Sequence, residues 1–437
     1  MMKALSTYQN FYFVGIGGIG MSALARFYFS NGWKVSGSDL AESDITKALA
    51  SEGIEINIGH SEANLKNDTE RVVFSAAVGS DNPELKKAEK LNIKASTYAE
   101  TLAELTREYF TIAVSGSHGK GTTTAMLALI MIEAGLDPIV IIGTLLKEFG
   151  GSNFRSGGGK YLLIEADEYD RSFLNYRPSV VVITNVDAEH LDVFHDIDGV
   201  VGAFNQYVKN LDKDSTAILN KNDINSEKIA LGYKGKIIYF DRGDWDLGVP
   251  GEFNQINAEA AWQAAKVIGV EKGIAKKALK GYIGAWRRME EVEPISGYEG
   301  AIFYSDYGHH PTEIKATTKA LKEKYSERKF LLVYQPHQAK RLEALFSDFI
   351  GAFDSVDELV LLPAYEVAGR EGVKGKTSDD LARAIEEKNS KSERVQGVHY
   401  LQSFEEALKL IGDQLVVFMG AGDIDKDVRK YFRSKLL

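Results

Sequence analysis

The 437 residues include no cysteine, so the chain has neither disulfide bonds nor thiolate chemistry. Proteins of the reducing cytoplasm commonly have this composition, and we therefore expect a cytoplasmic location. Residues Met1 to Thr7 lack the apolar core of a secretion signal, so we expect no signal peptide there.

Long hydrophobic runs and an excess of basic residues are also lacking. The longest apolar stretch, Ala125 to Gly143, is interrupted by Glu133, Asp137 and Pro138, so we expect no membrane insertion. The formal net charge of −10 argues against a general nucleic-acid binder, and we expect no nucleic-acid partner. Without low-complexity tracts or internal repeats, a chain of this length is expected to form about two to four globular domains.

Short apolar runs alternate with amphipathic segments, the pattern of α/β proteins with parallel sheets. The grouping of these runs predicts three domains, at residues 1–106, 107–290 and 291–437. The predicted strands are Phe11–Val14, Lys34–Gly37, Arg71–Ser75, Tyr109–Val114, Tyr161–Ile164, Val180–Ile183, Ala301–Ser305, Phe330–Tyr334, Glu358–Leu362 and Leu415–Met419.

A glycine-rich segment, Gly15-Ile16-Gly17-Gly18-Ile19-Gly20, directly follows the first predicted strand and precedes a helix predicted over Met21–Phe27. Asp39 ends the next strand, nineteen residues after Gly20. This spacing is typical of a dinucleotide site, in which the backbone approaches a diphosphate and the acidic residue lies near a ribose. NAD is one possible ligand, any other nucleoside diphosphate satisfies the same physics, and a purely structural turn is the third reading.

The most informative segment reads Val-Ser-Gly-Ser-His-Gly-Lys-Gly-Thr-Thr-Thr, from Val114 to Thr124. It lies between a predicted strand and an apolar helix predicted to begin at Thr122. Such a turn exposes backbone N–H groups and the positive end of a helix dipole, and Lys120 adds a mobile cation. Val114 and Gly121 depart from the standard phosphate-loop pattern, so we expect Thr122 to supply the metal-binding hydroxyl. We predict a nucleoside triphosphate cradle; the alternative is a glycine turn with an exposed lysine.

Carboxylates and an imidazole follow the next two predicted strands. Glu165, Asp167 and Glu168 come after one strand, and His190 follows the other. Oxygen ligands suit Mg²⁺, which also accepts a single nitrogen ligand. Because parallel strands end at one edge of a sheet, these residues predict a magnesium site beside the phosphate loop, with a solvated acidic loop as the alternative.

Taken together, these motifs resemble the Mur ligase family, the ATP-dependent amino-acid ligases of peptidoglycan precursor synthesis. The resemblance covers essentially the whole chain in the right order. It includes the family's ATP and magnesium motifs, its adenine-contacting helix start, its arginine pair and its third-domain nucleotide segment. The matching segments are Gly116–Lys120, Glu165–Glu168, Thr184–His190, Gly251–Ala258, Arg287–Arg288 and Asp306–Glu313.

The resemblance implies an α/β fold with a Rossmann-like N-terminal domain for a UDP-sugar, a central P-loop-type ATPase domain and a Rossmann-like C-terminal domain for an amino acid. Within the family, four segments favour the member that joins L-alanine to the lactyl carboxylate of UDP-N-acetylmuramate through an acyl phosphate. These segments are Gly15–Gly20, Tyr307–Glu313, Gln335–His337 and Gly420–Ile424. The implied cofactors are ATP and Mg²⁺, and we expect a monomer or a homodimer.

The resemblance also assigns roles to residues. It implies a catalytic group of Lys120, Glu165, His190, Glu168 and Asp167, with Thr122, Glu165 and His190 as metal ligands. It implies ATP contacts at Gly116, Ser117, His118, Gly119, Lys120, Gly121, Thr122, Thr123, Asn254, Asn257, Arg288 and Asp306. It implies UDP-sugar contacts at Gly15, Gly17, Gly18, Gly20, Asp39 and Ser75, and amino-acid contacts at Tyr307, His309, His337 and Arg341.

The sequence departs from the family pattern at Gln338, where the alanine ligases usually have a second arginine. A neutral amide does not replace a guanidinium clamp on a carboxylate. Either Arg341 with Lys340 holds the carboxylate, or the accepted amino acid differs, with glycine and serine as candidates. Two other functions stay open: a recycling ligase that adds a preformed tripeptide, and a catalytically idle nucleotide-binding regulatory protein.

Overall fold

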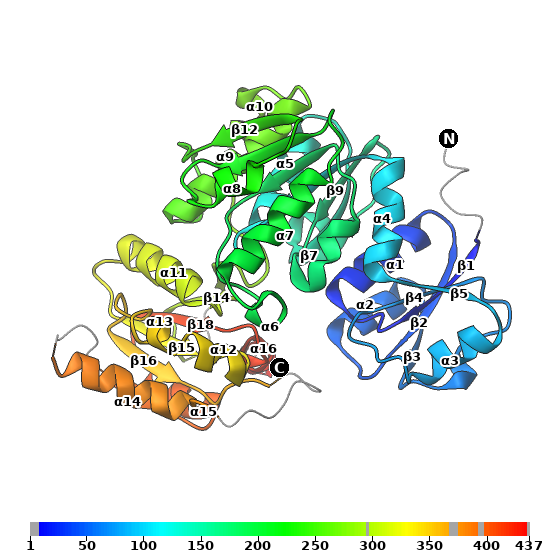
Figure 1. The fold of residues 1–437 in the computed structure, drawn as a ribbon. Helices are drawn as coiled ribbons and strands as arrows, with labels where there is room; N and C mark the ends of the chain where they lie inside the picture. The colour runs from blue at the N-terminus through cyan, green and yellow to red at the C-terminus, as the bar shows by residue number, and fades with distance from the viewer. Residues whose placement is uncertain (1–7, 294–296, 367–374, 392–396, 435–437) are drawn as a thin grey trace. The chain divides into compact units, whose positions relative to one another are not determined.

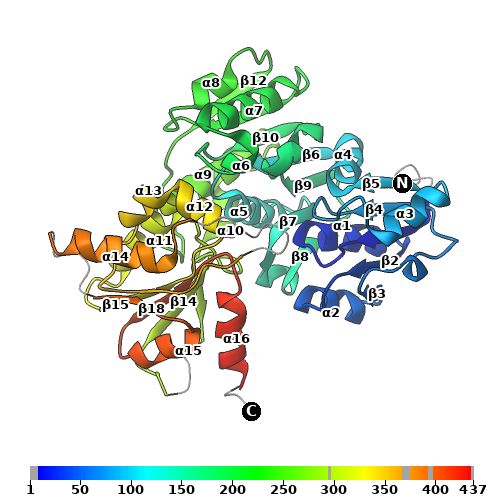
Figure 2. The same ribbon diagram turned by 60° about the horizontal axis from the view of Figure 1, so that its bottom comes forward.

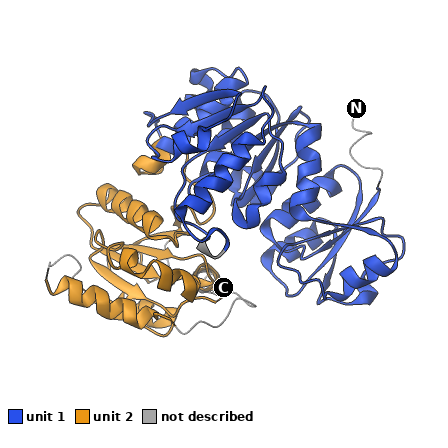
Figure 3. Cartoon of the chain, in the orientation of Figure 1, with its two compact units in different colours: residues 1–246, 256–280 blue, residues 247–255, 281–437 orange. Residues whose placement is uncertain are grey.

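The computed structural model describes residues 8–293, 297–366, 375–391 and 397–434 of an α/β chain. They form two compact units, one of residues 1–246 with 256–280 and one of residues 247–255 with 281–437 (Figure 3). Three sheets are present, two in the first unit and one in the second. None of the helices in these described ranges has the length and hydropathy that crossing a bilayer requires.

The first sheet has five parallel strands in the order β3-β2-β1-β4-β5 (Figure 1, blue). Its order reverses between β1 and β4, and in open α/β sheets ligands bind where the strand order reverses. The strands are β1 (Asn10–Val14), β2 (Lys34–Asp39), β3 (Glu55–Ile58), β4 (Arg71–Phe74) and β5 (Lys94–Thr97). The helices are α1 (Ile19–Ser30), α2 (Asp44–Ser51), α3 (Pro83–Lys90) and α4 (Tyr98–Glu108), with a 3₁₀ turn η1 (Glu62–Asn64).

The second sheet has seven strands in the order β12-β11-β10-β6-β9-β7-β8, all parallel except β8, which runs antiparallel to β7. Its strands are β6 (Phe110–Ser115), β7 (Ile139–Leu146), β8 (Ser152–Arg155), β9 (Tyr161–Glu165), β10 (Val180–Ile183), β11 (Thr216–Asn220) and β12 (Lys236–Phe240). Its helices are α5 (Lys120–Glu133), α6 (Leu191–Phe194), α7 (Ile197–Lys209), α8 (Ser226–Ala230) and α10 (Lys272–Leu279), with the 3₁₀ turns η2 (Lys147–Phe149) and η3 (Tyr169–Asn175). The residues of α9 (Glu252–Val267) are divided between the two units.

The third sheet has six strands in the order β13-β14-β18-β15-β16-β17, and Figure 2 shows β14, β18 and β15 side by side. Only β13 is antiparallel to its neighbour. The strands are β13 (Glu290–Val292), β14 (Ile302–Asp306), β15 (Phe330–Tyr334), β16 (Glu358–Leu361), β17 (Gly397–Tyr400) and β18 (Leu415–Met419). The helices are α11 (Pro311–Lys324), α12 (Ala339–Ala344), α13 (Phe346–Ile350), α14 (Ser378–Asn389), α15 (Phe404–Ala407) and α16 (Ile424–Ser434), with a 3₁₀ turn η4 (Leu408–Leu410).

The predicted strands are confirmed to within two residues, because most of them are apolar runs buried on both faces of a parallel sheet. The predicted start of the central helix at Thr122 is wrong. Gly119 is its N-cap at φ 82°, a left-handed conformation that glycine adopts readily, so the helix begins at Lys120. Lys120 therefore lies in the first helical turn rather than in the loop.

A buried polar contact joins the first two sheets within the first unit. Helix α1 packs against the β7–β8 hairpin, and the completely buried Asn153 of β8 lies between them. Its Oδ1 accepts a hydrogen bond from Arg26 Nη1 at 2.6 Å, and its Nδ2 donates to Ser22 Oγ at 2.9 Å and to the carbonyl oxygen of Ile19. Asn153 thus fixes the first turn of α1, which directly follows the glycine-rich segment.

We expect Asn153→Ala to lower the free energy of unfolding by about 3 kcal/mol, because it leaves buried hydrogen-bonding groups of Arg26 and Ser22 without this partner. Urea unfolding measures the change. Asn175→Ala is the matched control, since Asn175 is exposed and its amide reaches only the carbonyl oxygen of Ser172. Equal losses in the two variants would contradict a structural role for the buried contact.

Candidate active site

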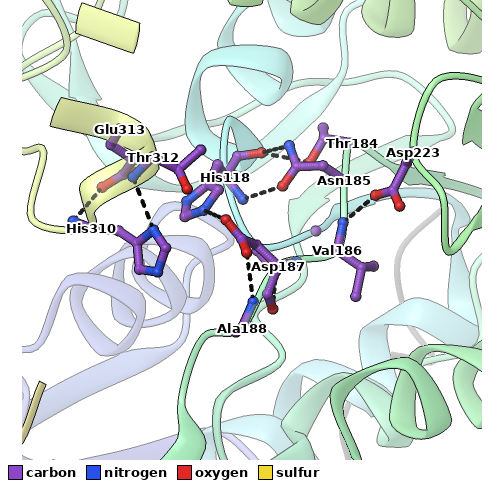
Figure 4. A network of polar contacts seen from close by, with 12 residues as sticks. His118, Thr184, Asn185, Val186, Asp187, Ala188, Asp223, His310, Thr312 and Glu313 are labelled. Atoms are coloured by element: carbon purple, nitrogen blue, oxygen red, sulfur yellow. Dashed lines mark hydrogen bonds and ion pairs between the residues drawn. The ribbon is translucent and has the colours of Figure 1, made fainter. Parts of the chain in front are cut away.

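The loop between β6 and α5 is clamped by the segment that follows β10 (Figure 4). The side chain of Asn185 makes two hydrogen bonds to the backbone of His118 in this loop. Its Oδ1 accepts from His118 N at 2.9 Å, and its Nδ2 donates to His118 O at 2.9 Å. Thr184 Oγ1 donates to His118 O at 2.6 Å, and Asp187 N donates to Ser117 Oγ at 2.9 Å. This support fixes the loop in the conformation expected of a phosphate cradle.

Lys120 lies over this loop and is almost completely buried. Its Nζ donates to Gly116 O at 2.7 Å and forms an ion pair with Glu168 Oε2 at 2.7 Å. Burial alone would lower the pKa of Lys120, but the carboxylates of Glu168 and Asp167 outweigh it and raise the pKa above its ordinary value. The lysine is therefore positively charged and lies at the N-terminal end of α5.

Glu168 has no exposed surface, and this burial raises its pKa to about 7, although Lys120 acts in the opposite direction. Its Oε2 accepts from Lys120, whereas its buried Oε1 has no hydrogen-bond partner among the described residues and lies 3.8 Å from His190 Nε2. A buried carboxylate oxygen with spare acceptor capacity is unusual in a folded protein and is suited to a cation.

Some of the potential metal ligands lie close together in the structure, and others do not. Ligand atoms of Asp167, Glu168 and His190 all lie within 4.8 Å of one another. His190 has φ of 55°, a left-handed conformation that residues other than glycine rarely adopt and that is often found at functional sites. Glu165 is not in this group; its carboxylate accepts from Gly143 N at 2.8 Å. Thr122 is buried in the first turns of α5.

Three further expected ATP contacts lie at or beside the cradle. Asn257, on α9, approaches Gly119 so closely that a Cβ added there would lie 2.5 Å from Asn257 Oδ1. Thr123 is fully buried, and its Oγ1 has no hydrogen-bond partner among the described residues. Gly121, the second residue of α5, has no side chain, and the nearest atom to a Cβ there would be Glu165 Oε2, at 3.4 Å.

The glycine-rich segment of the first sheet has the expected geometry. Gly15 N and Ile16 N donate to Ser38 O, and Gly17 N donates to Asp39 Oδ2 at 2.8 Å. Gly18 is the N-cap of α1, and no side chain caps that end of the helix. The N–H groups of Gly15 to Gly18 are thus used within the fold, and the N–H groups of the first turn of α1 are the ones suited to a diphosphate.

Ser75 and Gly20 complete the set expected around the UDP-sugar. Ser75 follows β4, and a Cβ on Gly15 would lie 3.1 Å from its Cβ, so the two residues face each other at the point where strand order reverses. Gly20 lies under the ring of Tyr98, since a Cβ there would lie 2.8 Å from Tyr98 Cζ. The structure thus gathers all six expected residues around the ends of β1, β2 and β4.

The prediction from sequence missed Tyr98. Burial raises the pKa of its phenol, and the nearby carboxylates of Glu165 and Asp167 raise it further. Its ring therefore lies between the glycine-rich segment and the acidic residues that follow β9. Tyr98 is the first residue of α4 and directly follows the capping residue Thr97. Nothing in this local sequence indicates that its ring contacts the glycine-rich segment.

A buried carboxylate behind the first site was also missed. Glu84 has no exposed surface and accepts hydrogen bonds from Tyr12 Oη at 3.0 Å, Ser38 Oγ at 2.6 Å and Asn64 Nδ2 at 2.8 Å. These contacts fix the end of β2, where Asp39 lies. A glutamate near the start of an amphipathic helix usually faces solvent, so the sequence alone does not reveal this network.

The second unit contains the remaining expected ATP contacts. Asp306 ends β14 and is buried; burial raises its pKa to about 6, while hydrogen bonds from Met289 N and Gly308 N, both 2.8 Å, act in the opposite direction. Arg288 lies 3.5 Å from Glu313 and stacks over the ring of Tyr307. Asn254 is buried and donates to Pro250 O at 2.6 Å.

The four expected amino-acid contacts form one cluster within the second unit. The rings of Tyr307 and His309 are 5.4 Å apart, and those of His309 and His337 are 5.9 Å apart. Arg341 Nη1 lies 3.3 Å from His337 Nδ1. The cluster thus places aromatic rings beside one guanidinium, a group that is suited to a carboxylate.

Tyr365 is a further member of this cluster that the sequence analysis missed. Its ring stacks on that of His337 at 5.7 Å and 12°, and its N–H donates to Pro336 O at 2.8 Å. Its carbonyl oxygen accepts from the N–H of Gln338 at 2.8 Å, and Gln338 adopts φ of 68°. This non-glycine residue in a left-handed conformation lies where the sequence departs from the family pattern.

Comparisons with known proteins agree along the chain. Residues 10–110 match the catalytic domain of the Mur ligase family, residues 114–243 its middle domain, and residues 287–422 its glutamate ligase domain. UDP-N-acetylmuramate–L-alanine ligase of Aquifex aeolicus is 38% identical over 98% of both chains. The protein of that name from Caldicellulosiruptor saccharolyticus is 36% identical over 96% of this chain and 97% of its own.

Solved structures give the same result. UDP-N-acetylmuramate–alanine ligase of Thermotoga maritima has a TM-score of 0.79 and 25% identity, covering 98% of this chain and 99% of its own. A murein peptide ligase of Psychrobacter arcticus has a TM-score of 0.70 at 21% identity, over 97% and 98% of the two chains, which shows a shared fold. With the sites described above and three matched domains in order, the chain belongs to the Mur ligase family.

Proposed function

We propose that this chain joins L-alanine to the lactyl carboxylate of UDP-N-acetylmuramate at the expense of ATP, a step of peptidoglycan precursor synthesis. The observation that carries this proposal is the agreement of full-length relatives, at 35–38% identity, that are all named for this reaction. Both nucleotide sites and the aromatic cluster of the second unit are consistent with it.

The UDP-sugar is assigned to the first sheet. Its diphosphate would lie at the N-terminus of α1, directly after the glycine-rich segment, where the helix dipole favours negative charge. Asp39 and Ser75 border this position. ATP is assigned to the β6–α5 loop, with Lys120 on the terminal phosphates and Asn257 near the adenine.

The reaction then needs positioning and charge neutralisation more than covalent participation by the protein. A carboxylate oxygen of the sugar attacks the γ-phosphorus of ATP, and the bond to the β-phosphate oxygen breaks, which gives ADP and an acyl phosphate. Lys120 moves from Glu168 to the phosphates and stabilises the charge that develops there. The amine of L-alanine attacks the acyl carbon, and inorganic phosphate leaves.

The residues present fit Mg²⁺. Glu168 Oε1 is buried without a hydrogen-bond partner among the described residues, and a ligand atom of Asp167 and one of His190 lie within 4.8 Å of a Glu168 carboxylate oxygen. Thr122 and Glu165 are the other candidates, at the start of α5 and the end of β9. Bound Mg²⁺ would neutralise phosphate charge during transfer.

We expect ATP-dependent phosphate release with UDP-N-acetylmuramate and L-alanine. We expect at least about tenfold lower kcat/KM with glycine, since one methyl group is worth about 1–3 kcal/mol in a fitted site, and a lower kcat/KM with serine, whose added hydroxyl group would be buried. The measurement is a phosphate-release assay with each of these amino acids and with the L-alanine-containing tripeptide, confirmed by mass spectrometry of the product.

Each alternative has its own result in this panel. Turnover with the tripeptide alone would replace the proposed function by the recycling reaction. A preference for glycine or serine would mean that Gln338 changes the accepted amino acid. Absence of turnover with every acceptor, in protein that still binds ATP, would identify the catalytically idle alternative.

A further inference from the structure

The hydroxyl end of the Tyr98 ring lies against the N-terminal turn of α1. Gly20 is the second residue of this helix, and a Cβ added to it would lie 2.8 Å from Tyr98 Cζ, 3.0 Å from Tyr98 Oη and 3.1 Å from Tyr98 Cε2. Any side chain at residue 20 would therefore displace the ring. The absence of a side chain at Gly20 allows the phenol to reach the turn whose N–H groups have no partner within the helix.

The Tyr98 hydroxyl group has no hydrogen-bond partner among the described residues. Its oxygen is not one of the buried polar atoms that lack a partner, and the residue as a whole is only partly buried. The oxygen is therefore accessible to a ligand. A tyrosine with a packed ring and an accessible, unpaired hydroxyl group is suited to donate a hydrogen bond to a bound molecule.

The local structure fixes the position of this ring. Tyr98 is the first residue of α4, directly after the capping residue Thr97. Thr97 N donates to Glu100 Oε2 at 2.8 Å, and Glu100 N donates to Thr97 Oγ1 at 3.2 Å. Helix α4 packs against both α1 and η3, and the Tyr98 ring packs against the hydrophobic core of the first unit. The hydroxyl group is thus held in place before any ligand binds.

The charges on the two sides of Tyr98 are opposite. On one side is the positive end of the α1 dipole, which favours an anion. On the other side are the carboxylates of Glu165 and Asp167, which raise the pKa of Tyr98 beyond the increase that burial causes. The phenol therefore keeps its proton. A neutral O–H donor at this position can bind an anion at α1 without adding a charge beside the two carboxylates.

We propose that Tyr98 donates a hydrogen bond from Oη to a diphosphate oxygen of the UDP-sugar bound at α1. This inference rests on the proposed function. The bond would hold the diphosphate on the side of α1 that faces the acidic residues after β9, and so would help to set the position of the sugar relative to ATP. The diphosphate does not react, so the bond contributes equally to binding of the substrate and of the transition state.

Tyr98→Phe in the full-length protein tests this contact, because it removes the hydroxyl group and keeps the ring over Gly20. A hydrogen bond to a charged group corresponds to about tenfold to 100-fold in affinity. We expect the Kd of UDP and that of UDP-N-acetylmuramate each to rise at least about tenfold by calorimetric titration. The KM for UDP-N-acetylmuramate should rise similarly, with kcat changed by less than about threefold. The Kd of a non-hydrolysable ATP analogue and the urea midpoint should stay unchanged, since the hydroxyl group has no partner within the described residues.

Tyr207→Phe is the matched control. Tyr207 lies on α7 in the same unit, and its buried Oη also has no hydrogen-bond partner among the described residues. We expect no change in the affinity of this variant for UDP. The comparison separates the loss of a ligand contact from the general effect of removing an unpaired phenol oxygen.

Unchanged affinity of Tyr98→Phe for UDP would overturn the proposal and leave the ring with a packing role alone. A loss for UDP-N-acetylmuramate without a loss for UDP would also overturn it, because the hydroxyl group would then contact the sugar. Weaker binding of the ATP analogue alone would assign Tyr98 to the other nucleotide. Failure of the wild-type protein to ligate alanine would refute the proposed function, whereas the UDP titration would still decide the role of Tyr98. If the wild-type protein did not bind UDP, the inference and the proposed function would both be refuted.

Discussion

Replacing Lys120 by alanine is expected to lower kcat for ATP-dependent ligation by at least about 1000-fold, because its ammonium group lies at the β6–α5 loop, where it would stabilise the transferring phosphoryl group. The substitution removes charge that matters most in the transition state, so kcat should fall more than ATP affinity. Phosphate release under saturating substrates measures the first quantity, and calorimetric titration with a non-hydrolysable ATP analogue measures the second.

The same substitution has a separate effect on stability. It leaves Glu168 buried without its ion-pair partner, and breaking a buried pair costs about 3 kcal/mol or more in the free energy of unfolding. Since burial already raises the pKa of Glu168 to about 7, the unpaired carboxyl takes up a proton, which limits the loss. We expect the double variant Lys120→Ala/Glu168→Gln to recover stability but not turnover. Turnover close to wild type in Lys120→Ala would refute the phosphate role.

The sequence predicts most of the strands that lie in the middle of a sheet, but not the interior strands β7 and β11. Val180–Ile183, now β10, is a run of four apolar residues that are all buried. Such a short continuous run is typical of a strand that is covered on both faces of its sheet. The edge strands β3 and β5 were not predicted, because exposed polar residues such as Glu55 and Lys94 interrupt their hydrophobic pattern. The hairpin strand β8 is short and has the sequence Ser-Asn-Phe-Arg, which has no strand-like alternation.

In the candidate site, too, some residues are predictable from the sequence and others are not. Lys120, Asp39 and His309 lie in contiguous motifs, in which the spacing itself indicates the chemistry. Tyr98 and Asn153 reach their positions only through tertiary contacts between α1, α4 and the β7–β8 hairpin, and no local pattern encodes those contacts.

Gly116→Ala is expected to abolish ligation and to lower the free energy of unfolding by about 3 kcal/mol. Gly116 has φ of 128°, where a side chain is strained, and a Cβ would collide with Thr184 Oγ1 and lie 2.9 Å from Thr184 N and 3.0 Å from Asn185 O. These atoms belong to the residues that hold the β6–α5 loop in place, so relief of the collision must displace the loop.

Gly135→Ala separates backbone strain from this collision. Gly135 follows α5 at φ of 72°, but no atom lies within 4 Å of a Cβ added there. We expect it to cost only the conformational strain of about 1 kcal/mol and to keep its ligase activity. Urea unfolding and phosphate release on both variants measure the difference. Because both substitutions add one methyl group at positive φ, the excess loss in Gly116→Ala measures how tightly the loop is held against Thr184 and Asn185. Equal losses, with activity retained in both, would mean that the loop tolerates displacement and that its clamped conformation is not the one that binds phosphate.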